Sequence, residues 1–446
     1  MSVTTDADVR RSHSADVSGL VMVPDAVARP ASTDDVRELL RQATADRTPV
    51  TTAGSQTSTT GASITDCGIL LSMRGMNRIV DVDVAGRRAV VEPGVLLGDL
   101  NRMLAPHGLH FAPDPTSLDD VTVGGAIACN ASGARSLLYG PTRPHVAALQ
   151  VVLATGDVAD VRRSGLEKNT VGYAFAQEPV DWFVGSEGTL GVITLAELSL
   201  LPLPASVVGL AIPCPDEGAA LRLVEAIRVA PKLAPRCIEY FDATSVAIAR
   251  EHGGAPWADG ALLYVEDTSG DLDPWLAIAE QHGALVADVG VFDGESALRD
   301  ARRFRHAVPA TMNERGSGRR VHGGRKVSTD WAVPYHKLAV AIAEARRLVD
   351  AAGLAQPAIY GHAGNGHPHE NFVAQDAADL EAIELVVEAT LKHVLSLGGT
   401  VSAEHGIGKI KRRWLPLQAT PLQIAVMRAV KRELDPGGLL APGNIL

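Results

Sequence analysis

Three histidines lie close together in the last third of the chain and offer metal or acid–base chemistry. His362, His367 and His369 fall in the segment YGHAGNGHPH, which we interpret as a glycine-rich loop, although the whole chain has only 14 histidines among 446 residues. Glu404 and His405 follow in the segment SAEHGIG. Two imidazoles and a carboxylate with an open position suit a divalent metal such as Zn²⁺, Mn²⁺ or Fe²⁺. The alternative interpretation is a set of hydrogen-bonded surface histidines in a turn.

A segment of glycine and hydroxyl residues near the N-terminus offers a different chemistry. Residues 53–61 read AGSQTSTTG and directly follow a predicted strand. Such a loop can direct backbone N–H groups and hydroxyls toward a diphosphate without a lysine, whereas the plainer interpretation is a polar surface turn. Glycine clusters within 123–133 and 185–191 suggest a long ligand that touches the main chain. Neither a Walker loop nor a GxGxxG motif between a strand and a helix occurs, so a nicotinamide-type Rossmann site lacks its fingerprint.

Several cations precede the histidine segment and could anchor an anionic substrate. Arg302, Arg303 and Arg305 fall on a predicted helix, and Arg325 and Lys326 follow it. The guanidinium group of arginine forms a fixed fork that matches a carboxylate, so one of these residues is a candidate substrate anchor. The alternative is that this charge is only the solvated surface of a helix.

The chain has two parts with different predicted secondary structure, and these parts must position the candidate residues. Up to about residue 203, short β-rich runs alternate with glycine loops, and the segment LPLP then breaks the pattern. Beyond it, long helical patterns alternate with a few strands, so we predict a domain boundary near residue 204. The predicted elements are helices at 36–43, 96–105, 217–229, 295–314, 334–352 and 377–397, and strands at 49–52, 69–72, 79–84, 89–92, 149–154 and 262–265.

Length and composition describe a globular protein of more than one domain. The chain is 46% hydrophobic and 21% charged, which excludes disordered, collagen-like and coiled-coil classes. The net charge is −11 and no run of Lys and Arg forms a basic stripe, so nucleic acid is not expected as a partner. The four cysteines form no CxxC pair. No segment approaches the roughly 20 apolar residues that span a bilayer, so we expect a cytoplasmic protein, with peripheral membrane association left open.

Several motifs, taken in order, resemble those of a known family. GSEGTLGVIT at 185–194, ahead of LP at 201–202, resembles the signature of FAD-linked oxidases of the vanillyl-alcohol-oxidase type. The motifs GHAGNGHPHEN at 361–371 and SAEHGIG at 402–408 resemble those of one branch of that family. This branch contains D-lactate dehydrogenase, the glycolate oxidase flavin subunit and D-2-hydroxyglutarate dehydrogenase. The resemblance runs from about residue 20 to the C-terminus.

The resemblance implies an α+β fold, with a two-subdomain FAD-binding lobe of the vanillyl-alcohol-oxidase type and an α+β cap that contains an antiparallel sheet. The implied domains are an FAD-binding domain at 20–204, a substrate or cap domain with the metal-binding motifs at 205–410, and a C-terminal segment at 411–446 that returns to the FAD domain. Non-covalent FAD is favoured, because residues 54–61 contain no histidine.

The resemblance also implies a metal site and a base. His362, His369 and Glu404 would be the metal ligands, and His405 would be the catalytic base. His367 stands where relatives commonly have asparagine, so it could reach the metal or the substrate.

Further residues are implied to bind the substrate and the FAD. Arg305 takes the place of an arginine that binds the substrate carboxylate, and Asn371 and Lys326 complete the implied catalytic group. The residues implied to line the FAD are Gly54, Ser55, Gln56, Thr57, Ser58, Gly61, Pro113, Asp114, Thr116, Gly124, Gly125, Ala131, Ser132, Gly133, Glu187, Gly188, Thr189 and Val192.

The implied reaction is FAD-dependent oxidation of a 2-hydroxy acid of the D-lactate, glycolate or D-2-hydroxyglutarate type to the 2-oxo acid. The metal would hold the substrate, His405 would accept the hydroxyl proton, and the α-hydrogen would pass as hydride to flavin N5. The implied electron acceptor is a quinone, a cytochrome or an electron-transfer flavoprotein, and a homodimer remains open. Three alternatives remain: a flavin oxidase for another alcohol, a metal-dependent hydrolase, and a flavin-binding subunit that supports a partner.

Overall fold

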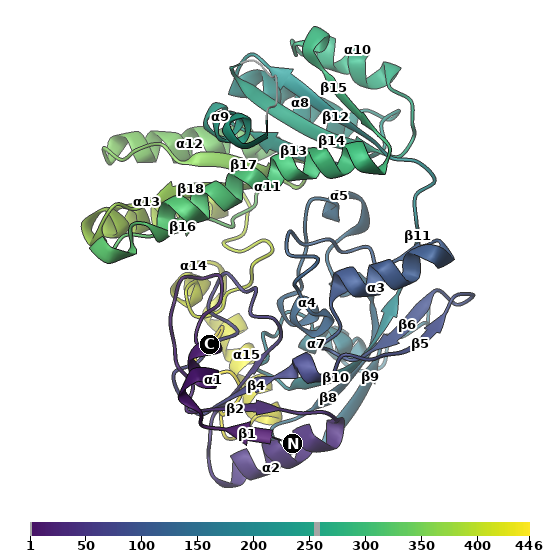
Figure 1. Ribbon diagram of the computed structural model, residues 1–446, viewed down its shortest axis with the longest axis vertical. Coiled ribbons are helices and arrows are strands. Elements are labelled where there is room, and N and C mark those ends of the chain that lie inside the picture. The colour runs from purple at the N-terminus through teal and green to yellow at the C-terminus, as the bar shows by residue number, and fades with distance from the viewer. Residues whose placement is uncertain (1, 254–258) are drawn as a thin grey trace. The chain divides into compact units, whose positions relative to one another are not determined.

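The computed structural model describes residues 2–253 and 259–446, which divide into two compact units (Figure 1). The first unit comprises the chain up to Gly133, Gly140–Leu203 and Glu404–Leu446, and the second comprises Ala134–Tyr139 and Pro204–Ala403. After Gly140 the chain passes from the first unit to the second at residues 203–204 and returns to the first at 403–404. The sequence predicts these two boundaries near 204 and 410. The histidine segment and the pair Glu404-His405 consequently belong to different units.

The first unit contains two main sheets. In the four-stranded sheet, ordered β1-β2-β4-β3, strands β2 and β3 both pair parallel with β4. Helix α2 (Thr33–Ala45) provides the crossover from β2 to β3, and the segment 54–68 connects β3 to β4. The five-stranded sheet, ordered β5-β6-β10-β8-β9, is antiparallel throughout. The strands of this unit are β1 (Ser2–Thr4), β2 (Ala26–Arg29), β3 (Val50–Ala53), β4 (Ile69–Ser72), β5 (Ile79–Asp83), β6 (Arg88–Val91), β7 (Leu109–His110), β8 (Val146–Val152), β9 (Val158–Arg162), β10 (Val192–Ser199) and β11 (Leu201–Pro202).

Helix α2 shows why apolar residues at helical spacing predict a helix in this unit. The side chain of Ser32 accepts a hydrogen bond from the backbone N–H of Asp35 and begins the helix, and the buried face consists of Val36, Leu39, Leu40 and Ala43. The predicted helix at 36–43 is confirmed, with further residues at both ends. The other helices of this unit are α1 (Ala7–Ser12), α3 (Leu97–Leu104), α4 (Val123–Cys129), α6 (Ala174–Gln177), α7 (Val180–Phe183), α14 (Leu415–Gln418) and α15 (Pro421–Leu434).

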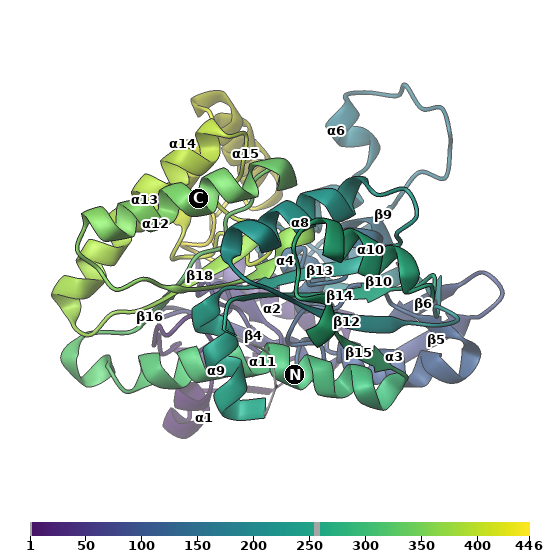
Figure 2. The ribbon, with the colours of Figure 1, turned by 90° about the horizontal axis from the view of Figure 1, so that it is seen from above.

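The second unit is built on one seven-stranded antiparallel sheet, ordered β15-β12-β14-β13-β17-β18-β16. Every residue of β12 and β14 is buried, because helices cover both faces of the sheet. In Figure 2, α8 and α12 lie on one side of these strands and α9 and α11 on the other. The strands are β12 (Val208–Cys214), β13 (Pro235–Phe241), β14 (Ala261–Asp267), β15 (Gly290–Asp293), β16 (Lys326–Ser328), β17 (Ala358–His362) and β18 (His367–Val373).

The helices of the second unit match the long helical patterns of the sequence. The pattern at 217–229 is helix α8 (Glu217–Val229), and the pattern at 295–314 extends three residues further as α11 (Glu295–Ser317). Among the helices that the structure describes, none is both long and apolar enough to cross a membrane. The remaining helices are α5 (Ser136–Tyr139), α9 (Ala243–Gly253), α10 (Asp273–Gln281), α12 (Leu338–Ala351) and α13 (Ala377–Ser396).

The histidine segment is a β-hairpin, which corrects the interpretation of this segment as a glycine-rich loop. His362 ends β17, His367 begins β18, and these two residues are register partners in the antiparallel pair. A short 3-10 turn at Ala363–Asn365 connects the strands, and Gly366 closes it with a φ of +68°. The alternating strand geometry therefore places His367 and His369 on the same face of β18.

Candidate functional site

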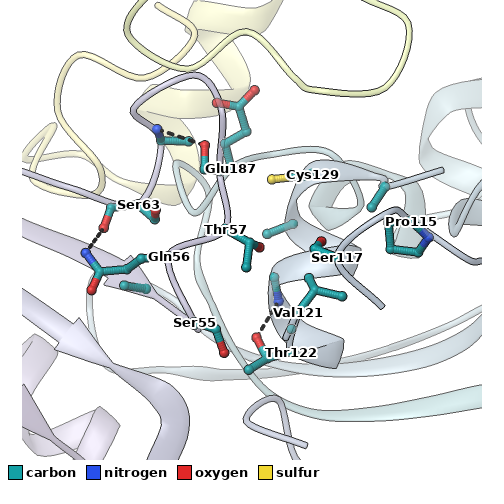
Figure 3. Close-up of a pocket in the computed structure, with 18 of the residues that line it drawn as sticks. Ser55, Gln56, Thr57, Ser63, Pro115, Ser117, Val121, Thr122, Cys129 and Glu187 are labelled. Atoms are coloured by element: carbon teal, nitrogen blue, oxygen red, sulfur yellow. Dashed lines mark hydrogen bonds between the residues drawn. The ribbon is translucent and has the colours of Figure 1, made fainter. Parts of the chain in front are cut away.

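A cavity of about 380 Å³ lies inside the first unit and has the size of a small-molecule site. Figure 3 shows Ser55, Thr57 and Ser117 around the open space. Its lining comes from the end of β3 and the loop after it, from helix α4 and from the segment that leads into β10. The wall is formed mainly by residues within the segments 52–59, 115–125, 128–132, 186–193 and 404–405.

Three hydroxyl residues of the cavity wall offer unused hydrogen-bonding groups. The side-chain oxygens of Thr52, Ser55 and Thr59 are buried and have no hydrogen-bond partner among the residues that the structure describes. A buried polar group without a partner costs about 1–3 kcal/mol, and such groups are rare in folded proteins. Phosphate oxygens accept hydrogen bonds from hydroxyls, so this donor set fits the diphosphate of the cofactor that the motifs imply.

Glycine allows two segments to approach each other closely beside the cavity. A Cβ atom added to Gly54 would lie 2.2 Å from Oγ1 of Thr122, and one added to Gly133 would lie 2.2 Å from the backbone oxygen of Asp114. A larger residue at either position would displace the neighbouring loop. The side chain of Gln56 fixes the first loop further, because its Nε2 donates to the backbone oxygens of His13 at 2.9 Å and Ser63 at 3.3 Å.

Glu187 connects two loops of the cavity wall. Its carboxylate oxygens accept hydrogen bonds from the backbone N–H groups of Ile407, at 2.6 Å, and Gly408, at 2.7 Å. Burial raises the pKa of Glu187, and the two backbone N–H groups oppose that effect by stabilising its charged form. The carboxylate thereby holds the segment that carries Glu404 and His405, both of which line the cavity.

The structure brings most of the predicted FAD-lining residues to this cavity. The predicted residues that line it are Gly54, Ser55, Gln56, Thr57, Ser58, Thr116, Gly124, Gly125, Ala131, Ser132, Glu187 and Gly188. The predicted residues outside its lining are Gly61, Pro113, Asp114, Gly133, Thr189 and Val192. Val192 is fully buried in the sheet, and the Thr189 hydroxyl donates to the backbone oxygen of Ser186 at 2.7 Å. Sequence reasoning missed Ser117, Val121, Thr122 and Cys129 in the lining, because no local motif marks them.

Three buried imidazoles form a second candidate site, in the second unit. The ring centroids of His362, His367 and His369 are 4.5 to 5.5 Å apart. All three residues are at most 7% exposed. A ring nitrogen of each lies within 4.8 Å of a ring nitrogen of the other two, so the set could hold a metal ion. This burial excludes the alternative of surface histidines in a turn.

Glu239 orients the first of these imidazoles. Its Oε1 lies 2.6 Å from Nδ1 of His362, and its Oε2 accepts a hydrogen bond of 2.6 Å from Nε of Arg305 on α11. Burial would raise the pKa of Glu239, but the charge of Arg305 and the hydrogen bonds with Arg305 and His362 outweigh it and lower that pKa to about 2. A carboxylate on Nδ1 fixes the tautomer in which Nε2 can bind a metal, as is common behind metal-binding histidines.

The other predicted substrate residues lie on strands close to the histidines in the same sheet. Asn371 is fully buried, and its Oδ1 has no hydrogen-bond partner among the described residues. Lys326 pairs with Val373 across the neighbouring strands, donates from Nζ to Asn313 at 2.9 Å, and has a pKa lowered by burial to about 8. Burial also raises the pKa of Glu370, beside His369, to about 7.

Sequence reasoning missed two carboxylates of this cluster. Glu239 lies 123 positions from His362 in the chain, and Asp330 lies 3.1 Å from Nε2 of His367. Glu239 could have been found as a charged residue within the apolar run of β13. Carboxylates are rarely buried unless they are paired, so its position indicated a charged or hydrogen-bonded partner. Only the sheet register shows which histidine each carboxylate meets.

Comparisons with known proteins identify the family of this chain. Residues 24–162 match a family model described as an FAD binding domain, and residues 203–445 match the C-terminal domain of FAD linked oxidases. The chain is 31% identical over 438 residues to the glycolate oxidase subunit GlcD of Bacillus subtilis (strain 168), which covers 95% of this chain and 89% of that protein. It is 32% identical over 425 residues to a D-lactate dehydrogenase of Archaeoglobus fulgidus, with 94% and 91% covered. Among solved structures, an alkyldihydroxyacetonephosphate synthase has a TM-score of 0.74 at 18% identity, with 99% of this chain and 83% of that one covered.

Proposed function

Because this chain belongs to the FAD-linked oxidase family, we propose that it oxidises a small 2-hydroxy acid of the D-lactate, glycolate or D-2-hydroxyglutarate type to the 2-oxo acid. FAD would take up the hydride that leaves the α-carbon. The observation that carries the proposal is the buried group of three imidazoles with Arg305 and Asn371, because it joins metal-binding and carboxylate-binding chemistry in one place.

The cavity of the first unit is the proposed FAD site. The unpartnered hydroxyls of Ser55 and Thr59 would donate to the diphosphate, and glycine in the neighbouring loops lets the main chain approach the ligand. No histidine occurs at residues 54–61, so this loop offers no histidine for covalent attachment to the flavin.

The histidine cluster is the proposed site for the acid. His362 and His369 direct their Nδ1 atoms at Glu239 and at the backbone oxygen of Thr329, and Nε2 of each would bind the metal. The motif resemblance adds Glu404 as a further ligand. A divalent ion held there would lower the pKa of a hydroxyl group bound to it.

The remaining residues would bind and deprotonate the substrate. Arg305 would bind the carboxylate, because Glu239 holds its guanidinium group in a fixed position. Asn371 has an unpartnered amide oxygen that would accept a hydrogen bond, and the ammonium group of Lys326 would add positive charge. His405, which lines the proposed FAD cavity, would accept the hydroxyl proton. Electrons would leave to a quinone, a cytochrome or an electron-transfer flavoprotein.

Dye-coupled turnover with a panel of acids tests this proposal. D-lactate, L-lactate, glycolate and D-2-hydroxyglutarate would each be supplied with an artificial electron acceptor, and the 2-oxo product would be identified. His405→Gln should lower kcat by about 10²- to 10⁴-fold, the usual contribution of a general base, while FAD content stays unchanged. The exposed His107 provides a matched control, because His107→Gln should leave turnover unchanged. Full activity in His405→Gln would contradict the proposed base.

A further inference from the structure

We propose that His367 is a third imidazole ligand of the metal site and that Asp330 is the carboxylate beside it, so that the site selects Zn²⁺ or another late first-row ion over Mn²⁺. This inference rests on the proposed function in one respect: both place a divalent metal at the histidine cluster. It goes further by naming two additional residues and the class of metal.

His367 occupies the same buried space as the two histidines of the implied metal site. Its ring centroid lies 4.5 Å from that of His369 and 5.3 Å from that of His362. The three residues are 2%, 4% and 7% exposed in chain order, so the rings have little contact with bulk solvent. Nε2 of His367 is buried and makes no hydrogen bond to the residues that the structure describes, which is costly in a low dielectric unless a cation binds there.

Asp330 supplies a carboxylate at the same point. Its Oδ1 lies 3.1 Å from Nε2 of His367, and one of its carboxylate oxygens lies within 4.8 Å of a ring nitrogen of His369. Asp330 is 1% exposed, and its Oδ2 accepts a hydrogen bond of 2.8 Å from the Ser402 hydroxyl. The Ser402 hydroxyl thus helps to hold the carboxylate in place, either beside the metal or on the ring that binds it.

The donor set indicates the class of metal. Imidazole nitrogens suit Zn²⁺, Fe²⁺, Ni²⁺ and Cu²⁺, whereas carboxylate, carbonyl and water oxygens suit Mn²⁺, Mg²⁺ and Ca²⁺. A third imidazole among the ligands therefore moves the preference toward Zn²⁺. The competing explanation is that His367 and Asp330 form only a buried hydrogen-bonded pair that never touches the metal.

X-ray absorption at the zinc edge counts imidazole ligands directly. The full-length flavoprotein would be stripped of metal, loaded with one equivalent of Zn²⁺ and measured, followed by His367→Asn and Asp330→Asn. His322→Asn is the matched control, because His322 is exposed and lies in the same unit. We expect the imidazole count to fall by one in His367→Asn and to stay unchanged in the control. An equal count in wild type and His367→Asn would overturn the proposal.

Competition between Zn²⁺ and Mn²⁺ gives a second readout that needs no turnover. The ratio of the dissociation constant for Mn²⁺ to that for Zn²⁺ should fall at least about tenfold in His367→Asn. Tenfold is the lower end of the loss in metal affinity that changes around a metal site usually cause. Far-UV circular dichroism and bound FAD would show that the variant is folded. An unchanged ratio in a folded variant would overturn the proposal.

The two proposals fail in different ways. If Zn²⁺ binds through His367 but no 2-hydroxy acid reduces the flavin, the proposed function fails and the metal assignment stands. If an acid reduces the flavin but the number of imidazole ligands is the same in wild type and His367→Asn, the function stands and this inference fails.

Discussion

Replacing Glu187 by glutamine should loosen the wall of the proposed FAD cavity. The side chain is 6% exposed and accepts hydrogen bonds from the backbone N–H groups of Ile407 and Gly408 at 2.6 and 2.7 Å. Glutamine has nearly the same shape but only one acceptor oxygen. Its NH₂ group would therefore face one of the two N–H donors, and that hydrogen bond would be lost.

The magnitude follows from these two bonds. A hydrogen bond to a charged group contributes about 1.5–3 kcal/mol, so losing one and neutralising the other removes roughly 4 kcal/mol in gross terms. Part of this loss is offset, because burial raises the pKa of Glu187 and the neutral amide escapes that desolvation cost. We therefore expect a net loss of about 2–3 kcal/mol in the free energy of unfolding of the segment that the carboxylate holds.

Hydrogen exchange of the amides of Ile407 and Gly408 measures this effect at its source. Because about 1.4 kcal/mol corresponds to a tenfold change, their protection should fall by roughly 30- to 140-fold in Glu187→Gln. Glu38, an exposed glutamate on α2, provides the control, and Glu38→Gln should change stability by less than about 0.5 kcal/mol. Unchanged protection of both amides in a folded Glu187→Gln protein would refute this reasoning.

Three further predictions concern titratable groups. Burial lowers the pKa of Lys326 to about 8, so kcat/KM should fall as the ammonium loses its proton above that pH, and Lys326→Arg should abolish the fall in a pH profile. Burial would raise the pKa of Glu266, but Arg135 and Arg236 hold it well below its usual range; its stabilisation is therefore present above about pH 4.5 and is lost as pH falls further. Glu266→Gln should flatten that acid limb in denaturant titrations and cost about 3–5 kcal/mol at pH 7, and a cost below 1 kcal/mol would contradict the buried ion network. Burial, with a smaller effect from Glu187, raises the pKa of Cys129 to about 12, so a thiol reagent at pH 8 should leave this residue unlabelled in native protein when labelled peptides are mapped.

Local features of the sequence predict much of the fold. The patterns at 69–72 and 217–229 coincide with β4 and α8, because each element has a regular apolar face and clear turn or cap residues at its ends. The FAD-linked oxidase family is also confirmed, since its motifs are short, contiguous and in the expected order. The short segment Ala134–Tyr139 belongs to the second unit because it packs against β13. The sequence could not predict this assignment, since no change in composition marks the segment.

The residues of the candidate site could likewise be predicted only in part. The three histidines were found because they lie within ten residues of each other, and strand alternation then brings His367 and His369 to one face. Glu239 and Asp330 were missed because their contacts depend on strand register across the sheet. The hydroxyls of Thr52 and Thr59 could be predicted only as part of a polar loop, since their lack of partners is a property of the folded cavity.

The visible spectrum of the purified protein during anaerobic addition of 2-hydroxy acids tests the central claim most directly. We predict a yellow protein from which acid precipitation releases FAD, and bleaching of the oxidised flavin by at least one acid of the panel, with one equivalent of 2-oxo acid formed per flavin. A protein that stays colourless after incubation with FAD, or a bound flavin that none of these acids bleaches, would contradict the account.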